Sequence, residues 1–146
     1  NKSTNCGENA LFSLILARKK GINPKTVILM QDSSMQLRMD ATYKKEWREC
    51  TTKFISYAAY RAHVIVKNDQ LTFEDNNLWG MWNIDHYITL LLGEIPRLHD
   101  TISGYGPNGE NHIVHVDIPN EVIAAFEHLK IHYSKYVRTP WQGSIK

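Results

Sequence analysis

The sequence has few cysteines, little excess charge and no long apolar run. Its two cysteines are too few for a disulfide framework and cannot form a zinc site by themselves. Its 17 basic side chains exceed the 15 acidic ones by only two, which argues against a dedicated nucleic-acid-binding protein, since such proteins are usually strongly basic. No apolar stretch is long enough to span a bilayer, and no secretory leader is recognisable. These absences favour a protein of the reducing cytoplasm that does not act on nucleic acids or membranes.

The composition is that of an ordinary folded domain. Hydrophobic residues make up 42% of the chain and charged residues 22%, as in globular proteins and unlike disordered ones. A length of 146 residues suits one domain with a sizeable core, so we expect a single domain over residues 1–146. Because the sequence starts at Asn1 and not at methionine, we expect it to be excised from a longer protein.

Three stretches have apolar residues every three or four positions, which is the spacing of an amphipathic helix. They cover residues 7–20, 40–61 and 83–92. Gly21 and Gly93 follow the first and the third stretch as natural C-terminal caps. A short strand is predicted just after the third helix, over residues 95–99.

The second half of the chain has strand character. Three runs rich in β-branched and aromatic residues follow a glycine-rich turn region at residues 103–111. These runs cover residues 112–118, 122–127 and 132–138. Helices in the first half and strands in the second predict an α+β fold, with the helices packed on a small, mostly antiparallel sheet.

Cys6 is the first candidate for chemistry, because it lies at the N-terminal edge of the first predicted helix. The unpaired N–H groups and the dipole of a helix N-terminus stabilise a thiolate, which is the reactive form of cysteine. Backbone N–H groups at the same place can bind the oxyanion that forms in acyl transfer. A small buried core residue is the alternative for Cys6, and it is the preferred interpretation for Cys50, which falls on the apolar face of the second predicted helix.

A cysteine nucleophile needs a base, and the chain has seven histidines. Sequence spacing does not choose among them, because the base is a neighbour of the nucleophile in space and not along the chain. Two contexts are favoured, namely the strand-like run that contains His112 and His115 and the run that begins with His132. The spacing of three places His112 and His115 on opposite faces of a strand, so the sequence predicts no metal site and no cofactor.

Short blocks of sequence follow one another in a recognisable order. They are Asn5-Cys6 with Ala10-Leu11, Trp79-Gly80 before the third predicted helix, residues 122–126, and His132-Tyr133. In order and spacing these blocks resemble the ovarian-tumour (OTU) family of cysteine proteases over nearly the whole chain. The resemblance implies a papain-like OTU fold in which Cys6 is the nucleophile and His132 is its base.

The resemblance also implies the residues that support this pair. They are the backbone N–H groups of Thr4, Asn5 and Cys6, which would bind the oxyanion, and Trp79, Gly80 and Tyr133, which would contact the substrate. Packing in the core is the alternative for Trp79, because large aromatic side chains are usually buried.

Two positions depart from the OTU pattern. The family usually has Asp three residues before the cysteine, where this chain has Ser3, and Asp or Asn two residues after the histidine, where it has Ser134. The acid normally orients the imidazole. Three options are therefore open: an enzyme with a Cys–His dyad, a triad completed by Ser134 or another group, and an inactive domain.

The function implied by the resemblance is removal of ubiquitin or a ubiquitin-like protein, by a monomer that cleaves after the modifier's C-terminal glycine. The compact size and the missing acids favour a viral member, which would act in the host cytoplasm on host signalling and could also cut its own polyprotein. Two other hypotheses stay open. One is another papain-like cysteine protease with His112 or His115 as base, and the other is an inactive module that binds ubiquitin.

Overall fold

The structure, a computed structural model, describes residues 2–75 and 79–141. Within these ranges the chain forms helices and short strands, which confirms the α+β class. In chain order they are α1 (Cys6–Lys19), β1 (Thr26–Gln31), α2 (Ser33–Glu46), β2 (Lys53–Ala58), β3 (Val64–Lys67), β4 (Gln70–Phe73), α3 (Ile84–Leu98), α4 (Asn120–Tyr133) and the 3-10 helix η1 (Ser134–Tyr136).

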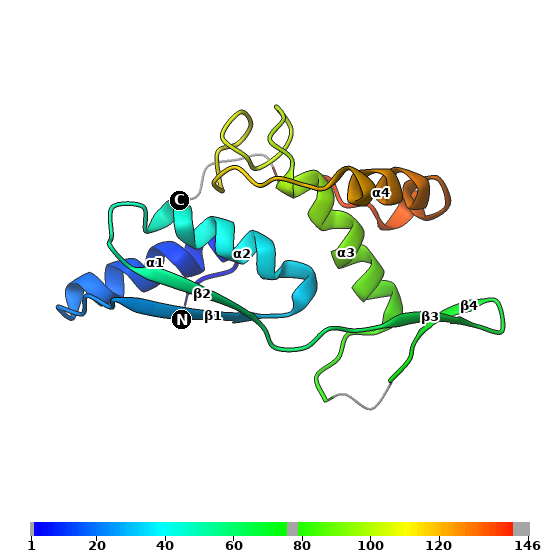
Figure 1. The fold of residues 1–146 in the computed structure, drawn as a ribbon, viewed down its shortest axis with the longest axis horizontal. Coiled ribbons are helices and arrows are strands. Elements are labelled where there is room, and N and C mark those ends of the chain that lie inside the picture. The colour runs from blue at the N-terminus through cyan, green and yellow to red at the C-terminus, as the bar shows by residue number, and fades with distance from the viewer. Residues whose placement is uncertain (1, 76–78, 142–146) are drawn as a thin grey trace.

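The helices α1 and α2 pack against each other, and α2 also contacts β1, β2 and α3. Figure 1 shows α1 and α2 together on one side of the β1–β2 pair, whereas α3 extends from the β3–β4 hairpin to α4. The loop between α3 and α4 lies close to the end of α2, because the Val114 N–H donates to the Ala41 carbonyl over 3.2 Å. This arrangement brings the loop after α3 toward the start of α1.

The strands form two separate two-stranded sheets among the described residues, in place of one mostly antiparallel sheet. β1 and β2 are parallel, with partners running from Thr26 and Lys53 to Gln31 and Ala58. β3 and β4 are antiparallel and are joined by a two-residue turn. Both turn residues, at positions 68 and 69, have positive φ angles of 52° and 58°, as a type I′ hairpin turn requires.

The first helix is confirmed close to its predicted bounds. α1 begins at Cys6, and Lys20 is its C-cap. Gly21 follows with a φ of 65°, a conformation that glycine adopts without strain. The local signals of a helix start and stop were sufficient here, because both depend on residues within one turn of each end.

The predicted second helix over residues 40–61 is wrong in its second half. α2 begins earlier, at Ser33, and ends at Glu46, and the chain then turns into β2. The aromatic spacing was misleading, because Phe54 joins the same cluster from a strand. Its ring centroid lies 5.9 Å from that of Tyr43 and 5.9 Å from that of Trp47. Cys50 is accordingly a half-buried residue of the turn after α2 and not a mid-helix core residue.

The strands predicted over residues 95–99, 122–127 and 132–138 are also wrong. The first is the end of α3, which continues through Pro96 because the buried Leu92 and Leu98 extend its apolar face. Residues 122–127 lie inside α4, which begins after Pro119, and residues 132–136 complete α4 and form η1. Strand propensity depends strongly on context, and in these runs packing overrides it.

The strand predicted over residues 112–118 is wrong too, because this segment forms no regular secondary structure in the described chain. Its apolar side chains contact a core cluster instead. Ile113 is 1% exposed and packs with Ala41, Leu98 and Tyr105, and Val114, Val116 and Ile118 pack against that group. This segment is therefore fixed to α2 and α3 by its side chains.

The glycine-rich region predicted as a turn is a tightly folded loop between α3 and residues 112–118. The Tyr105 N–H donates to the Arg97 carbonyl over 2.9 Å, and the N–H groups of His112 and Ile113 donate to the Tyr105 carbonyl over 2.8 and 3.0 Å. A Cβ atom on Gly104 would lie 1.9 Å from the His99 carbonyl oxygen, so only glycine fits there. The loop thereby holds Tyr105 and His112 next to each other.

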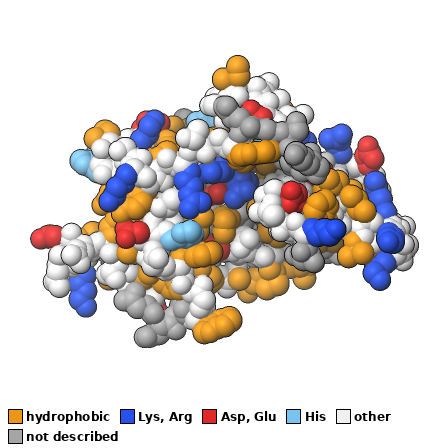
Figure 2. Space-filling view, turned by 180° about the vertical axis from the view of Figure 1, so that it is seen from behind, with side chains coloured by type: hydrophobic (Ala, Val, Ile, Leu, Met, Phe, Trp, Pro, Cys, Tyr) orange, Lys and Arg blue, Asp and Glu red, His pale blue; other side chains and the backbone are white. Residues whose placement is uncertain are grey.

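None of the helices in the described ranges is long and apolar enough to cross a membrane. On the face shown in Figure 2, basic, acidic and apolar side chains are interspersed. This surface agrees with the small net charge of the chain.

Candidate functional site

A cavity of about 440 Å³ lies where the start of α1 meets α2 and the glycine-rich loop. We call it the Cys6 cavity. The side chains that matter for its chemistry are Cys6, Glu8, Arg38, Tyr105, His112 and Trp141. The cavity therefore contains a thiol, an imidazole, a carboxylate and a guanidinium group.

The start of α1 is held by a network of short-range hydrogen bonds. The Asn5 side chain accepts from the Glu8 N–H over 2.9 Å. The Glu8 carboxylate in turn accepts from the Thr4 N–H over 2.6 Å and from the Thr4 hydroxyl over 3.0 Å. This reciprocal pattern resembles a capping box and fixes the backbone on both sides of Cys6.

The network changes the predicted set of oxyanion donors. The Thr4 N–H is bonded to Glu8, so it does not serve as a donor in this conformation. A helix start leaves its first N–H groups without acceptors in the helix, and that of Glu8 is taken by Asn5. The N–H groups of Asn5, Cys6 and Gly7 are therefore the candidate donors at the cavity, which all three residues line.

His112 is the histidine that the structure brings to the Cys6 cavity. Its half-buried ring lies edge-on to Tyr105, at a centroid distance of 5.1 Å and an interplanar angle of 78°. It also stacks on Trp141, at a centroid distance of 5.8 Å and an interplanar angle of 23°. Two aromatic rings thus fix the orientation of the imidazole.

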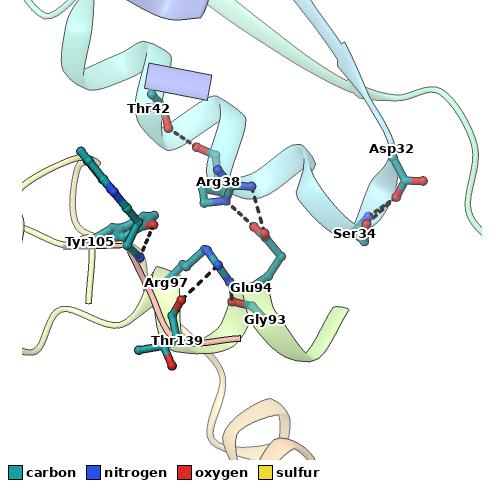
Figure 3. A network of polar contacts seen from close by, with 10 residues as sticks. Asp32, Ser34, Arg38, Thr42, Gly93, Glu94, Arg97, Tyr105 and Thr139 are labelled. Carbon is teal, nitrogen blue, oxygen red and sulfur yellow. Dashed lines mark hydrogen bonds and ion pairs between the residues drawn. The ribbon is translucent and has the colours of Figure 1, made fainter. Parts of the chain in front are cut away.

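The segment that carries Trp141 is itself tied to the loop and to α3. The Trp141 N–H donates to the Tyr105 hydroxyl oxygen over 2.9 Å. The Thr139 carbonyl accepts from Arg97 over 3.4 Å, and the same guanidinium also donates to the Gly93 carbonyl. Figure 3 shows Arg97 pointing from α3 toward Thr139.

The structure does not bring His132 to Cys6. His132 lies exposed in the last turn of α4, with its ring centroid 5.6 Å from that of His128, and it does not line the Cys6 cavity. The reason is that residues 120–133 form a helix packed on α3 and not the predicted strand. Ser134 is exposed at the start of η1. The ring centroid of Tyr133 lies 6.2 Å from that of Tyr136. Neither residue lines the Cys6 cavity.

The predicted substrate residues Trp79 and Gly80 are also away from the cavity. They precede α3, whose first residue is Ile84. The Trp79 side chain is 100% exposed, so its packing in the core is excluded as well. Gly80 has a φ of 78° and makes a turn before the helix.

His115 is engaged in a different contact. Its Nδ1 atom lies 2.7 Å from Asp100 and its Nε2 atom 3.1 Å from Asp117. Asp100 also accepts the Asn108 N–H over 2.6 Å. His115 therefore contacts one acidic residue before the glycine-rich loop and one after it, and it does not line the Cys6 cavity.

These contacts shift two pKa values in opposite directions. The pKa of Asp100 is lowered, mainly by the hydrogen bond from the Asn108 N–H and then by that from His115. The pKa of His115 is raised, mainly by its hydrogen bond with Asp100 and then by that with Asp117. Both shifts favour the ion pair over the neutral pair.

The stability contributed by this ion pair is expected to depend on pH in both directions. It is fully present below the ordinary pKa of 6.5 for His115 and is lost as the pH rises through the raised folded value. It is present above the ordinary pKa of 3.8 for Asp100 and is lost as the pH falls through the lowered folded value. The Tm difference between the wild type and His115→Gln should therefore be largest between pH 3.8 and 6.5.

The measurement is a series of thermal unfolding curves at different pH values. His132→Gln is the matched control, because His132 is an exposed histidine on α4. We expect its Tm to follow that of the wild type throughout. A Tm loss in His115→Gln that does not change with pH would contradict the ion-pair interpretation.

Arg38 and Glu94 form a buried ion pair beside the cavity that the sequence did not predict. Arg38 donates from Nε to Glu94 over 2.6 Å and from Nη2 over 2.9 Å. The two side chains are 15% and 6% exposed. Figure 3 shows Arg38 of α2 and Glu94 of α3 pointing toward each other.

The environment of Arg38 keeps its positive charge. Burial by itself lowers the pKa of Arg38, but the hydrogen bonds and negative charge of Glu94, with a smaller contribution from Cys6, raise it above its ordinary value. The Thr42 hydroxyl donates to the Arg38 carbonyl over 2.7 Å, which anchors this turn of α2. The guanidinium is therefore a fixed cation at the wall of the Cys6 cavity.

The chain matches no known protein-family model. Among the residues that the structure describes, no group of three or more histidine, cysteine or acidic side chains is arranged to hold a metal ion. The chemistry available at the Cys6 cavity is that of the thiol, the imidazole and the backbone N–H groups at the helix start. Such an arrangement suits nucleophilic attack on an acyl group.

Proposed function

We propose that the chain is a cysteine hydrolase that cleaves an amide or isopeptide bond, with Cys6 as nucleophile and His112 as base. The observation that carries the proposal is that both side chains line one cavity at the start of α1. The proposal keeps the nucleophile that the sequence predicts. Its base comes from the alternative hypothesis of another papain-like protease, which uses His112 or His115.

The reaction has two steps. His112 accepts the thiol proton, and the sulfur of Cys6 attacks the carbonyl carbon of the substrate. The oxyanion is bound by N–H groups from Asn5, Cys6 and Gly7, and the intermediate collapses when His112 gives the proton to the leaving amine. Water, deprotonated by His112, then hydrolyses the thioester and releases the acid and the free thiol.

The orientation of the imidazole does not depend on an acid in this proposal. In a triad the third residue holds the ring in the productive orientation. Here the rings of Tyr105 and Trp141 both pack on His112, at centroid distances of 5.1 and 5.8 Å, and their packing restricts its rotation. This supports a dyad enzyme rather than a triad completed by Ser134.

The substrate class proposed is the C-terminal glycine linkage of ubiquitin or a ubiquitin-like protein. It comes from the resemblance to the OTU family, which depends on the order and spacing of the sequence blocks that begin with Asn5-Cys6 and end with His132-Tyr133. The cavity adds that the scissile bond would lie between α1 and the glycine-rich loop. Contacts from Trp79 and Tyr133 are not part of this proposal, because both lie outside the Cys6 cavity.

The test is the reaction with a ubiquitin bearing a C-terminal electrophile, followed by intact mass. We expect a stoichiometric covalent adduct with the wild type and with Cys50→Ala, and none with Cys6→Ala. Cys50→Ala is the matched control, because Cys50 is the other half-buried free cysteine. The Cys6 variants should keep their fold, since the site is a half-buried surface position.

Other outcomes separate the parts of the proposal. An adduct that persists in Cys6→Ala would reject Cys6 as the nucleophile. Reaction of Cys6 with a short peptide electrophile but not with the ubiquitin electrophile would support the proposed cysteine hydrolase and reject ubiquitin as its substrate. Binding of ubiquitin without any adduct would favour the inactive module.

A further inference from the structure

Asp100 lies just after the end of α3 and before the glycine-rich loop. Each of its two carboxylate oxygens has a partner of its own. Oδ1 accepts the Asn108 N–H over 2.6 Å, and Oδ2 lies 2.7 Å from His115 Nδ1. This one side chain therefore connects the end of α3 both to the loop and to the segment that follows the loop.

The loop folds closely around the Asp100 carboxylate. The side chain is only 13% exposed, although the His115 side chain that contacts it is 56% exposed. The backbone at Gly106 passes so near that a Cβ atom there would lie 2.5 Å from Asp100 Oδ1. The carboxylate is thus an internal part of the loop and not a solvated surface group.

The two partners of Asp100 lie on either side of His112 along the chain. Asn108 comes four residues before His112, and His115 comes three residues after it. Between them, the N–H groups of Asn111 and His112 donate to the Gly106 and Tyr105 carbonyls over 3.0 and 2.8 Å. A single carboxylate therefore holds both ends of the short span that carries His112.

We infer that Asp100 is a positioning residue, which holds the Asn108–His115 span so that the His112 imidazole stays at the Cys6 cavity. The inference rests on the proposed function, in which His112 is the base. Asp100 does not line the cavity, so it acts through His112 and not on the substrate. In a triad the acid binds the base directly, whereas here the acid binds the backbone and side chain on the two sides of the base.

An aspartate suits this role because an ionised carboxylate offers two acceptor oxygens, and hydrogen bonds to a charged acceptor are stronger than neutral ones. Asp117 differs in both place and contacts. It approaches the same His115 from the other nitrogen over 3.1 Å, but it lies after the span and its side chain is fully exposed. Asp117 therefore provides a matched control for Asp100.

The test compares the wild type with Asp100→Ala, which removes both contacts. The first measurement needs no substrate and records the NMR signals of the carbon-bound ring protons of His112, which the rings of Tyr105 and Trp141 shift. We expect these signals to move toward those of a histidine without ring contacts. The second measurement is hydrolysis of a fluorogenic ubiquitin C-terminal amide. We expect kcat to fall by about 10²-fold, the usual effect of a misplacement of about 1 Å, with KM nearly unchanged.

Asp117→Ala removes the exposed acid that contacts the same histidine. We expect its His112 signals and its kcat to match those of the wild type. If Asp100→Ala fails to fold by circular dichroism, His115→Ala takes its place, because it removes one of the two contacts of Asp100 at an exposed position. We expect the His112 signals to move in the same direction and kcat to fall by a smaller factor.

Unchanged His112 signals and an unchanged kcat in folded Asp100→Ala would overturn the inference, even if the Tm fell, because Asp100 would then only stabilise the fold. Equal effects in Asp117→Ala would overturn it too, since they would follow from lost negative charge. The inference and the proposed function fail separately. Moved His112 signals in a protein that does not hydrolyse the ubiquitin amide would keep the role of Asp100 and reject the deubiquitinase. Hydrolysis that Asp100→Ala does not affect would do the reverse.

Discussion

Replacement of His112 by alanine is expected to lower kcat/KM for hydrolysis of a fluorogenic ubiquitin C-terminal amide by about 10²–10⁴-fold, which is the usual contribution of a general acid–base residue. The physical reason is that His112 both removes the thiol proton and protonates the leaving amine. KM should change much less than kcat, since the imidazole acts on the reacting atoms. The measurement is initial rates over a range of pH.

His132→Ala is the matched control for this experiment. His132 is exposed in the last turn of α4 and lies outside the Cys6 cavity, so we expect its kcat/KM to stay within about twofold of the wild type, as for a surface substitution away from the site. Circular dichroism would verify that His112→Ala keeps its fold after losing its ring contacts. Loss of activity in His132→Ala with activity kept in His112→Ala would restore the base implied by the OTU resemblance.

The part of the site that depends on local sequence could be predicted. The position of Cys6 at the start of α1 is confirmed, because each end of that helix has its signal within one turn, a capping Asn5 at the start and Gly21 after the end. The choice of base could not be predicted, because it depends on which loop packs against the start of α1. His112 is 106 residues from Cys6 along the chain, and only the folded glycine-rich loop brings it to the cavity.

The fold, like the site, could be predicted only where local sequence decides the structure. α1 and α3 were predicted from apolar spacing, whereas α4 was taken for two strands because residues 122–126 are rich in β-branched and apolar side chains. β-branched residues lower helix propensity only slightly, so the contacts with α3 and η1 decide the outcome. The error matters for function, because it placed His132 on a sheet beside the cysteine.

The Arg38–Glu94 pair shows why a charged part of the site was missed. The two residues are 56 positions apart, and each falls outside the helix bounds that apolar spacing predicts. A buried charge has no periodic signal of its own, because charged residues in helices are usually on the solvent side. The contact becomes visible only when α2 is packed on α3.

Removal of the Glu94 carboxylate alone is expected to destabilise the protein strongly. Glu94→Leu leaves the Arg38 guanidinium buried without its partner, and breaking a buried ion pair in this way costs about 3–5 kcal/mol. The side chains involved are only 15% and 6% exposed, so water screens the lost contact little. The free energy of unfolding would be measured in urea at pH 7.

A surface acid gives the matched control for Glu94→Leu. Glu49 forms an ion pair with Arg18 over 3.7 Å, but its side chain is 75% exposed. Surface pairs of this kind contribute about 0–1 kcal/mol, so Glu49→Leu should leave the free energy of unfolding nearly unchanged. A similar loss in both variants would mean that the new leucine, and not the broken pair, causes the effect.

The double variant Arg38→Met/Glu94→Leu then separates the two contributions of the pair. Replacement of a buried ion pair by apolar residues of similar volume is often neutral or stabilising, so we expect most of the stability lost in Glu94→Leu to return. Stability as low in the double variant as in Glu94→Leu would contradict this and would mean that the hydrogen bonds of the pair hold α2 on α3. Recovery of stability would instead mean that the packing of α2 on α3, and not the charges of the pair, stabilises the fold.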